Sequence, residues 1–326
     1  MRATSKDVAV AAGVSRATVS YVLNSTPGQT IPEATRQRVL DAARRLGYTP
    51  HASARALRSG ASSLALLITQ ELPFGINIAR LVDVLTRGAA ELGLSLVTWQ
   101  RSDETGLAST LAHLQPRVVI TMLKLSVGEQ ELLDRAGVVV LDPTGGEPHD
   151  ARDARIGEAQ ARYLAEAGHR RLGVVTTDNP LLTIFAGPRL EGVRRACRDL
   201  GIAEPEVLEL GDPDDATAGR VADALHAWRA RAEPVTGLCA YNDVYGAACL
   251  AAAQSLGLEV PRGLAVIGVD DEPMARFTAP PLTTVRLQLD ELSDATLERL
   301  RSLLSGESVP AAAAPGAVTL VRRGSA

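Results

Sequence analysis

Residues 4–23 constrain the fold of this chain more than any other stretch of its sequence. Thr4 can cap a helix, and the apolar residues that follow recur at helical spacing over residues 6–12. Gly13 comes next, and glycine tolerates the left-handed conformation that ends many helices. Ser15 can then cap a second helix, whose inward-facing residues are Val19, Val22 and Leu23. The spacing predicts two short helices joined by a tight turn.

The outer face of the second helix suits contact with nucleic acid. It combines short hydroxyl side chains, which can bind phosphates, with longer side chains that can reach base edges. These residues are Ser15, Arg16, Ala17, Thr18, Ser20, Tyr21 and Asn24. An ordinary helical hairpin has the same two helices and glycine turn, so the pair alone does not decide the function.

A third helix follows and makes a helix-turn-helix domain the better interpretation. Residues 31–33 read Ile-Pro-Glu, and proline is favoured in the first turn of a helix. Val39, Ala43 and Leu46 form its expected inner stripe, and Gly47 ends it. Residues 50–60 are then basic and rich in small residues, which is typical of a hinge too short to be a stable helix alone.

The charge distribution supports the same interpretation. The formal net charge of the chain is −4, but residues 1–60 carry nine basic and three acidic side chains, a net +6, against −10 for the remainder. A basic head on an acidic body is typical of a polyanion-binding module joined to a second function. A merely solvated basic surface would give the same count.

The sequence resembles the LacI/GalR (lac repressor) family of bacterial transcription regulators. The resemblance rests on KDVAVAAGVSRATVSYVLN, on EATRQRVLDAARRLGYTPHASARALRSG and on later motifs, and it covers nearly the whole chain. It implies that Arg16, Ala17 and Tyr21 read bases, that Leu57 wedges into a minor-groove base step, and that a further set anchors phosphates. That set is Thr4, Ser15, Thr18, Ser20 and Asn24.

Beyond residue 63 the sequence alternates strand and helix patterns, which predicts parallel sheets covered by helices on both faces. The expected strands are residues 64–69, 95–99, 118–122, 138–141, 172–176, 207–210, 235–240 and 265–269, with a last strand at 318–321. The expected helices are residues 78–92, 159–167, 189–200, 216–230 and 244–256. A break near residues 152–157 suggests two such sheets facing a ligand cleft.

The predicted fold class is therefore α/β, with an all-α helix-turn-helix head and a two-lobed body of two doubly wound parallel sheets. The resemblance implies a body like that of periplasmic binding proteins, with crossings between lobes near Arg155, Arg286 and Gly316. The expected domains are residues 1–48 for the head, 49–60 for the hinge helix, 61–157 with 286–315 for one lobe, and 158–285 with 316–326 for the other.

Matching the family motifs gives five candidate effector contacts. They are Phe74 after the first strand of the body, Arg189 at a helix start, Asn242 and Asp243 after one strand, and Asp270 after another. Each has a simpler interpretation: Phe74 as a core aromatic or a dimer contact, Arg189 as a surface arginine, Asn242 as a turn residue, and Asp243 or Asp270 as a helix N-cap. Residues 71–77, 142–152 and the Asp153-Ala154 pair depart from the family pattern, so an effector other than a simple sugar, or none, stays open.

We expect a transcriptional regulator, and specifically a repressor, that is not an enzyme and needs no metal or other cofactor. Its expected partners are near-palindromic double-stranded operator DNA, a small-molecule effector such as a sugar or sugar derivative, and a second copy of the chain, since no leucine heptad follows the last strand. Three cysteines without metal spacing, a polar N-terminus and no long apolar run predict a cytoplasmic protein. The alternatives are a solute-binding protein that shares the body fold, and a DNA-binding protein with a vestigial, ligand-free body.

Overall fold

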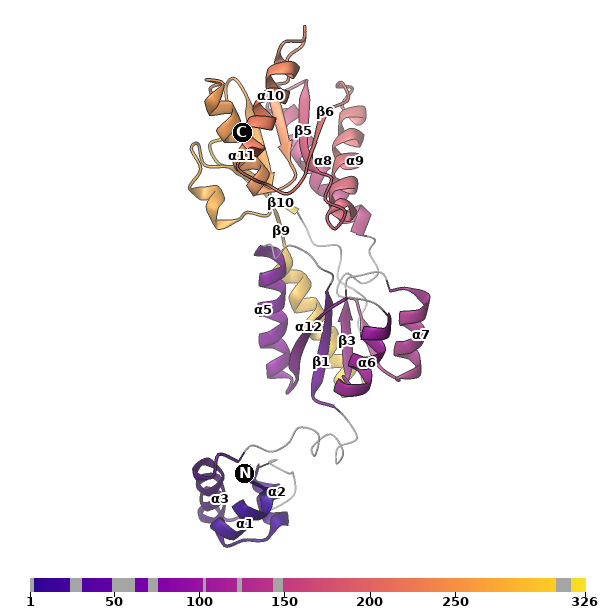
Figure 1. Cartoon of the computed structure of the whole chain (residues 1–326), viewed down its shortest axis with the longest axis vertical. Helices are drawn as coiled ribbons and strands as arrows, with labels where there is room; N and C mark the ends of the chain where they lie inside the picture. The colour runs from indigo at the N-terminus through magenta and orange to yellow at the C-terminus, as the bar shows by residue number, and fades with distance from the viewer. Residues whose placement is uncertain are drawn as a thin grey trace. The chain divides into compact units, whose positions relative to one another are not determined.

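The computed structural model describes residues 3–23, 31–48, 62–69, 76–101, 104–121, 125–142, 149–308 and 318–326 (Figure 1). They belong to two compact units, one comprising Met1–Leu64 with Leu114–Arg117 and the other the remainder of the chain. The first unit contains the three-helix head, and the second contains nearly all of the two sheets.

The head contains three helices, α1 (Ser5–Ala12), α2 (Arg16–Leu23) and α3 (Glu33–Arg45). Thr4 caps α1 as predicted: its hydroxyl accepts from the amide of Asp7 at 3.3 Å, and the Asp7 carboxylate accepts from the amide of Thr4 at 2.8 Å. Gly13 ends α1 at φ 64°, where a side chain would be strained. The buried residues of the head form one cluster: Val8, Ala9, Ala12, Val19, Val22, Val39, Ala42 and Ala43.

One core prediction in the head is wrong. Leu46 lies at the C-cap of α3 and is 40% exposed, whereas Ala42 takes the inward position. The inner stripe of α3 therefore ends one turn earlier than the apolar pattern suggests.

The first sheet of the body has the strand order β2-β1-β3-β4. Its strands are β1 (Leu64–Thr69), β2 (Ser95–Gln100), β3 (Val118–Thr121) and β4 (Val139–Leu141). β3 runs parallel to both β1 and β4, with Leu66 opposite Val119. Helices α5 (Ile76–Glu91) and α12 (Leu289–Ser305) share a core cluster with this sheet, and α6 (Glu104–Leu114) and α7 (Val127–Arg135) lie on its other side (Figure 1). The sequence patterns did not predict α6, α7 or α12.

The second sheet has the strand order β10-β9-β8-β7-β5-β6. Its strands are β5 (Leu172–Thr177), β6 (Glu206–Leu210), β7 (Gly237–Ala240), β8 (Ala265–Val269), β9 (Thr283–Leu287) and β10 (Val318–Val321). Neighbouring strands are parallel except β10, which is antiparallel to β9 and pairs Thr319 with Arg286. The sequence predicted neither β9 as a strand nor the antiparallel edge.

Helices cover both faces of the second sheet. Alternate residues such as Val174 and Ile267 belong to one core cluster, with α8 (His149–Glu166) and α9 (Thr183–Asp199). Their neighbours Val175 and Val266 belong to the other, with α10 (Thr217–Arg229) and α11 (Asp243–Ser255). The α/β class with doubly wound sheets is confirmed.

Residues 152–157, where the sequence suggested a break between two sheets, lie inside the continuous helix α8, which comes between β4 of the first sheet and β5 of the second. Gly157 serves close helix packing. A Cβ at Gly157 would overlap the carbonyl oxygen of Arg189 on α9, and a Cβ at Gly192 on α9 would overlap that of Ala154 on α8. The two glycines let the backbones of α8 and α9 approach closely, which places Asp153 beside Arg189.

Candidate DNA-binding face and effector site

The exposed face of α2 presents the side chains that the sequence singled out. Arg16 and Ala17 are exposed and Tyr21 is 37% exposed, whereas Val19 and Val22 on the opposite face are 1% and 3% exposed. Arg16 forms no ion pair with any other described residue, so its guanidinium is available to an external partner. The head core thus fixes which face of α2 points outward.

The hydroxyl residues near the helix starts form local caps. The Ser15 hydroxyl accepts from the amide of Thr18 at 3.0 Å and lies 2.9 Å from the Thr18 hydroxyl. Thr4 is exposed, and Ser20 is half-buried. Asn24 and Leu57, the remaining predicted DNA contacts, lie outside the described residues.

Arg189 is an inward-facing side chain of α9, not a surface arginine. Its Nε donates to Oδ1 of Asp153 at 2.9 Å, and its Nη1 donates to the carbonyl oxygen of Tyr241 at 2.8 Å. The guanidinium carbon also lies 4.8 Å from the centre of the Tyr241 ring, within cation–π range. Burial opposes the charge of Arg189, but Asp153 and then Asp270 outweigh it and hold the pKa of Arg189 above its ordinary value.

Asp270 follows β8 and lies in the same group of side chains as Arg189, Asp153 and Tyr241. We call this group, together with Asn77, the Arg189 cluster. Oδ1 of Asp270 accepts from Nδ2 of Asn77 on α5 at 2.8 Å. The backbone of Asp270 has φ 100°, a conformation rare for residues other than glycine. Burial raises the pKa of Asp270 above its ordinary value, and the Arg189 guanidinium opposes this shift. The structure therefore brings together Arg189 and Asp270, two of the predicted contacts.

Asn242 and Asp243 have structural contacts of their own. The Asn242 side chain caps α11 by accepting from the amides of Val244 at 3.1 Å and Tyr245 at 3.2 Å. Asp243 is fully buried, and both oxygens of its carboxylate have partners within the protein. Its Oδ1 accepts from the Thr284 hydroxyl at 2.6 Å and its Oδ2 from the amide of Glu272 at 2.7 Å.

Three residues of the cluster were not predicted as site residues: Asp153, Tyr241 and Asn77. Asp153 is 1% exposed, and its Oδ2 accepts no hydrogen bond from any described residue, although it lies 3.5 Å from Nη2 of Arg152. A buried carboxylate oxygen without a donor suits a ligand hydroxyl or amine. Phe74, the remaining predicted contact, lies outside the described residues.

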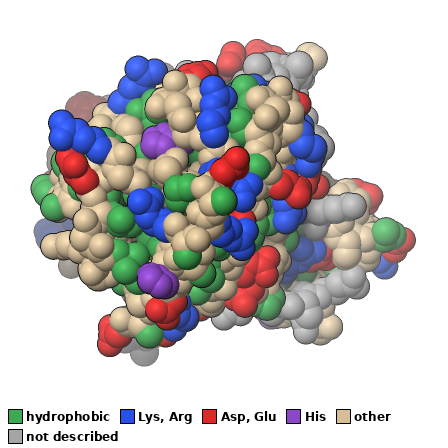
Figure 2. Space-filling view, turned by 90° about the horizontal axis from the view of Figure 1, so that it is seen from above, with side chains coloured by type: hydrophobic (Ala, Val, Ile, Leu, Met, Phe, Trp, Pro, Cys, Tyr) green, Lys and Arg blue, Asp and Glu red, His purple; other side chains and the backbone are tan. Residues whose placement is uncertain are grey.

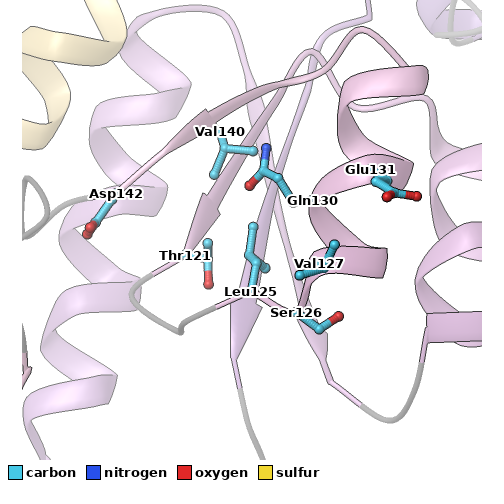
Figure 3. A pocket seen from close by; sticks show the side chains of 8 residues that line it. All are labelled: Thr121, Leu125, Ser126, Val127, Gln130, Glu131, Val140 and Asp142. Atoms are coloured by element: carbon cyan, nitrogen blue, oxygen red, sulfur yellow. The ribbon is translucent and has the colours of Figure 1, made fainter.

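A hollow of about 440 Å³ lies at the carboxyl ends of β3 and β4 (Figure 3). It is lined by Thr121, Leu125, Ser126, Val127, Gln130, Glu131, Val140 and Asp142. The neighbouring α7 is anchored by Glu129, which is 3% exposed and accepts from Nε of Arg101 at 2.7 Å. Burial opposes ionisation of Glu129, but Arg101 and the amide of Ser126 hold its pKa below the ordinary value. The hollow and the Arg189 cluster both lie at carboxyl ends of parallel strands, where ligands bind in this fold class.

Basic and acidic side chains are interleaved on the face shown in Figure 2. Basic and acidic side chains also form ion pairs between helices α8 and α9: Arg195 lies 2.5 Å from Glu158, and Arg162 lies 2.8 Å from Asp199. These pairs are partly exposed, so each contributes little to stability. Among the described residues, no helix combines the length and apolar character needed to cross a membrane.

Two family models match the chain. Residues 4–51 match the model described as bacterial regulatory proteins, lacI family, and residues 161–326 match the periplasmic binding protein-like domain. The first match covers the helices of the head, and the second covers the second sheet with most of its helices. A helix-turn-helix head joined to a periplasmic-binding-protein-like body defines the class of the protein as a DNA-binding transcriptional regulator.

Curated relatives match over nearly their whole length. The ribose operon repressor of Escherichia coli (strain K12) is 31% identical over 312 residues, which cover 91% of this chain and 92% of the relative. The transcriptional repressor PurR of Escherichia fergusonii is 31% identical over 316 residues, with 91% and 89% covered. The chain therefore belongs to the LacI family of bacterial regulatory proteins.

Solved structures agree on the fold. The lac repressor dimer bound to operator and the anti-inducer ONPF has a TM-score of 0.78 at 24% identity, with 100% of this chain and 99% of that chain covered. The complex of the transcriptional regulator CelR with cellobiose has a TM-score of 0.64 at 25% identity, with both chains covered completely. The predicted family and fold are thus confirmed.

Proposed function

We propose that α2 is the recognition helix of a repressor and that Arg16, Ala17 and Tyr21 contact base edges in the major groove. The observation that carries this proposal is the exposure of these three side chains opposite buried Val19 and Val22. Arg16 can donate two hydrogen bonds to O6 and N7 of guanine, and the Ala17 methyl group can contact a thymine methyl group. Tyr21 adds an amphipathic ring at the same face.

The remaining DNA contacts position the head without reading sequence. We propose that the phosphate contacts come from Thr4, Ser15, Thr18, Ser20 and Asn24, and that Leu57 wedges into a base step of the minor groove. Two copies of the chain would place two heads on a near-palindromic operator, because the symmetry of a dimer is mirrored in its site. The solved lac repressor dimer on operator supports this arrangement.

We propose that a small-molecule effector binds at the Arg189 cluster. Asp270 and the Oδ2 of Asp153, which accepts no hydrogen bond from any described residue, supply acceptors, Tyr241 supplies an aromatic ring, and Asn242 and Phe74 complete the contacts. Acceptors next to an aromatic ring suit a polyhydroxylated ligand, and the relatives include a ribose operon repressor and a regulator solved with cellobiose. A sugar or sugar derivative is therefore the effector class that we propose.

The effector would change operator affinity without any catalysed reaction, in the cytoplasm of the cell. We propose that residues 1–48 form the DNA-binding head, residues 49–60 the hinge helix, and the remaining residues the two effector-binding lobes. The coupling between effector and DNA is reciprocal and is typically about 1–3 kcal/mol in proteins of this kind.

Selection from a random duplex library with the full chain tests the DNA-binding proposal. The wild-type protein should enrich a near-palindromic sequence, and Arg16→Ala should lose preference at one base pair in each half-site. A chain that enriches no sequence would contradict the proposal. For the effector, a thermal-shift screen with sugars and nucleosides should give hits that Asp270→Asn abolishes, whereas hits unaffected by Asp270→Asn would place the site elsewhere.

A further inference from the structure

The loop that carries Asp270 is held in a costly backbone conformation. Asp270 and Asp271 are consecutive non-glycine residues with positive φ, 100° and 50°. Such conformations cost free energy and persist only where surrounding contacts determine them. Three backbone amides of the loop are anchored: that of Asp270 donates to the carbonyl oxygen of Val285 at 2.8 Å, that of Asp271 to the Thr284 hydroxyl at 3.4 Å, and that of Glu272 to the Asp243 carboxylate at 2.7 Å.

A further anchor is the side chain of Asp271, which is 1% exposed. Its Oδ2 accepts from Nε of Arg286 on β9 at 2.8 Å, and its Oδ1 accepts from Nη2 of Arg323. Burial opposes ionisation of Asp271, but Arg323 and Arg286 outweigh it and hold its pKa below the ordinary value. Asp271 is thus an ionised carboxylate clamped between two guanidinium groups.

Arg323 is itself firmly placed, which distinguishes it from Arg286. It is 13% exposed against 42% for Arg286. Its Nη1 donates to the carbonyl oxygen of Leu282 at 2.7 Å, and its backbone amide donates to the Thr283 hydroxyl at 3.0 Å. Arg323 therefore joins three elements: the segment after β10, the start of β9 and the loop after β8.

The residues that follow Arg323 fix this segment in the second sheet. Ser325 is fully buried, and its hydroxyl donates to the carbonyl oxygen of Val266 at 2.6 Å and accepts from the amide of Thr283 at 2.8 Å. Its carbonyl oxygen accepts from the amide of Val266 at 2.8 Å. Because these bonds hold the segment against β8 and β9, Arg323 has a rigid base from which to position the loop.

We infer that Arg323 is a positioning residue for the effector site, which acts by holding Asp271 and thereby keeps the Asp270 carboxylate aimed at the Arg189 cluster. This inference rests on the proposal that Asp270 contacts the effector. Arg323 touches no effector in this scheme. Removing the charge of Arg323 leaves Asp271 buried with one guanidinium partner. The strained loop then loses the anchor that comes from the segment after β10, and its remaining anchors come from β9 and from Asp243.

Amide hydrogen–deuterium exchange of the full chain without effector tests the inference. Arg323→Met keeps the aliphatic length and removes the charge, so the amides of Asp270 and Glu272 should exchange at least about tenfold faster, while amides in β5 and β7 keep their rates. Arg323→Lys, which keeps a donor and a positive charge, should restore slow exchange. Arg322→Met is the matched control, because the Arg322 guanidinium instead lies 5.5 Å from the centre of the Tyr163 ring.

Two outcomes overturn the inference. Unchanged exchange in the loop of Arg323→Met would show that Arg323 does not position it, and equal acceleration across β5, β7 and the loop would show a general structural role. Should Arg323→Met fail to fold, Asp271→Asn removes the charge from the other side of the pair at the same size, and the same local acceleration is expected. Because no effector is present, failure here differs from failure of the proposed function, which the Asp270→Asn ligand screen reports separately.

Discussion

The Asp153–Arg189 pair should contribute far more to stability than a neighbouring pair that connects the same two helices. Asp153 and Arg189 are 1% and 12% exposed, with Nε and Oδ1 2.9 Å apart. Glu158 and Arg195 also join α8 to α9, but they are 22% and 44% exposed. Removing one partner of a buried pair costs about 3–5 kcal/mol, because the other charge is left buried without compensation. An exposed pair contributes about 0–1 kcal/mol.

Asp153→Asn is the informative change, and Glu158→Gln is its matched control. Asparagine keeps an acceptor for Arg189, and Asp270 still offsets part of its charge. We therefore expect a loss of about 3 kcal/mol in the free energy of unfolding, at the lower end of the range for buried pairs. The control should lose less than about 1 kcal/mol. Urea unfolding of both variants at neutral pH gives the two values. Equal losses, or an Asp153→Asn protein as stable as the wild type, would refute the view that Asp153 compensates a buried guanidinium.

Three further predictions concern pH, DNA specificity and the hinge. Burial raises the pKa of Asp243 from its ordinary value of 3.8 to about 7, so between these values the folded state keeps a proton that the unfolded state has lost. The contribution of Asp243 to the free energy of unfolding therefore falls as the pH rises from 4 to 7. In urea unfolding, Asp243→Asn should make the free energy of unfolding depend less on pH over this range. Parallel pH profiles for the variant and the wild type would contradict this prediction. Arg16→Ala should cost about 1–3 kcal/mol at one base pair of the selected site, whereas Arg44→Ala on α3 should leave the sequence preference unchanged. Leu57→Gly should weaken binding to the selected duplex more than to random duplex, and equal losses in the two titrations would argue against a wedge.

The head was largely predictable because its signals are local. Thr4, Gly13 and Ser15 act on residues within one turn of themselves, so their cap roles follow from the sequence alone. The prediction that Leu46 points inward was wrong for a local reason too. Leu46 is the C-cap residue of α3, beyond the last regular turn, where helical spacing no longer sets which way a side chain points.

The strands of the body were also predictable, because most are short apolar runs buried on both faces. Strand β9, which lies between β8 and β10, was not predicted as a strand because its sequence, TTVRL, mixes polar and apolar residues. Its threonines are buried through contacts that the sequence cannot show: Thr284 bonds to Asp243, and Thr283 bonds to Ser325.

The candidate site was predictable only in part. Arg189 and Asp270 follow from motif positions, but the partner of Arg189 lies 36 residues earlier in the chain. That pairing depends on the close approach of α8 and α9 at Gly157 and Gly192, and glycines within a sequence pattern suggest a break as readily as a helix contact. The burial of Asp243 could not be predicted, because an Asn-Asp pair after a strand looks the same in the sequence whether its carboxylate faces a ligand or the interior.

We expect the outer face of α2 to give this chain a preference for one DNA sequence. Titration of the full chain against the selected duplex and a scrambled duplex, at physiological salt, measures that preference directly. We predict binding to the selected duplex at least about a thousandfold tighter than to the scrambled one, as for specific DNA-binding proteins in general. Equal affinity for the two duplexes would contradict this expectation.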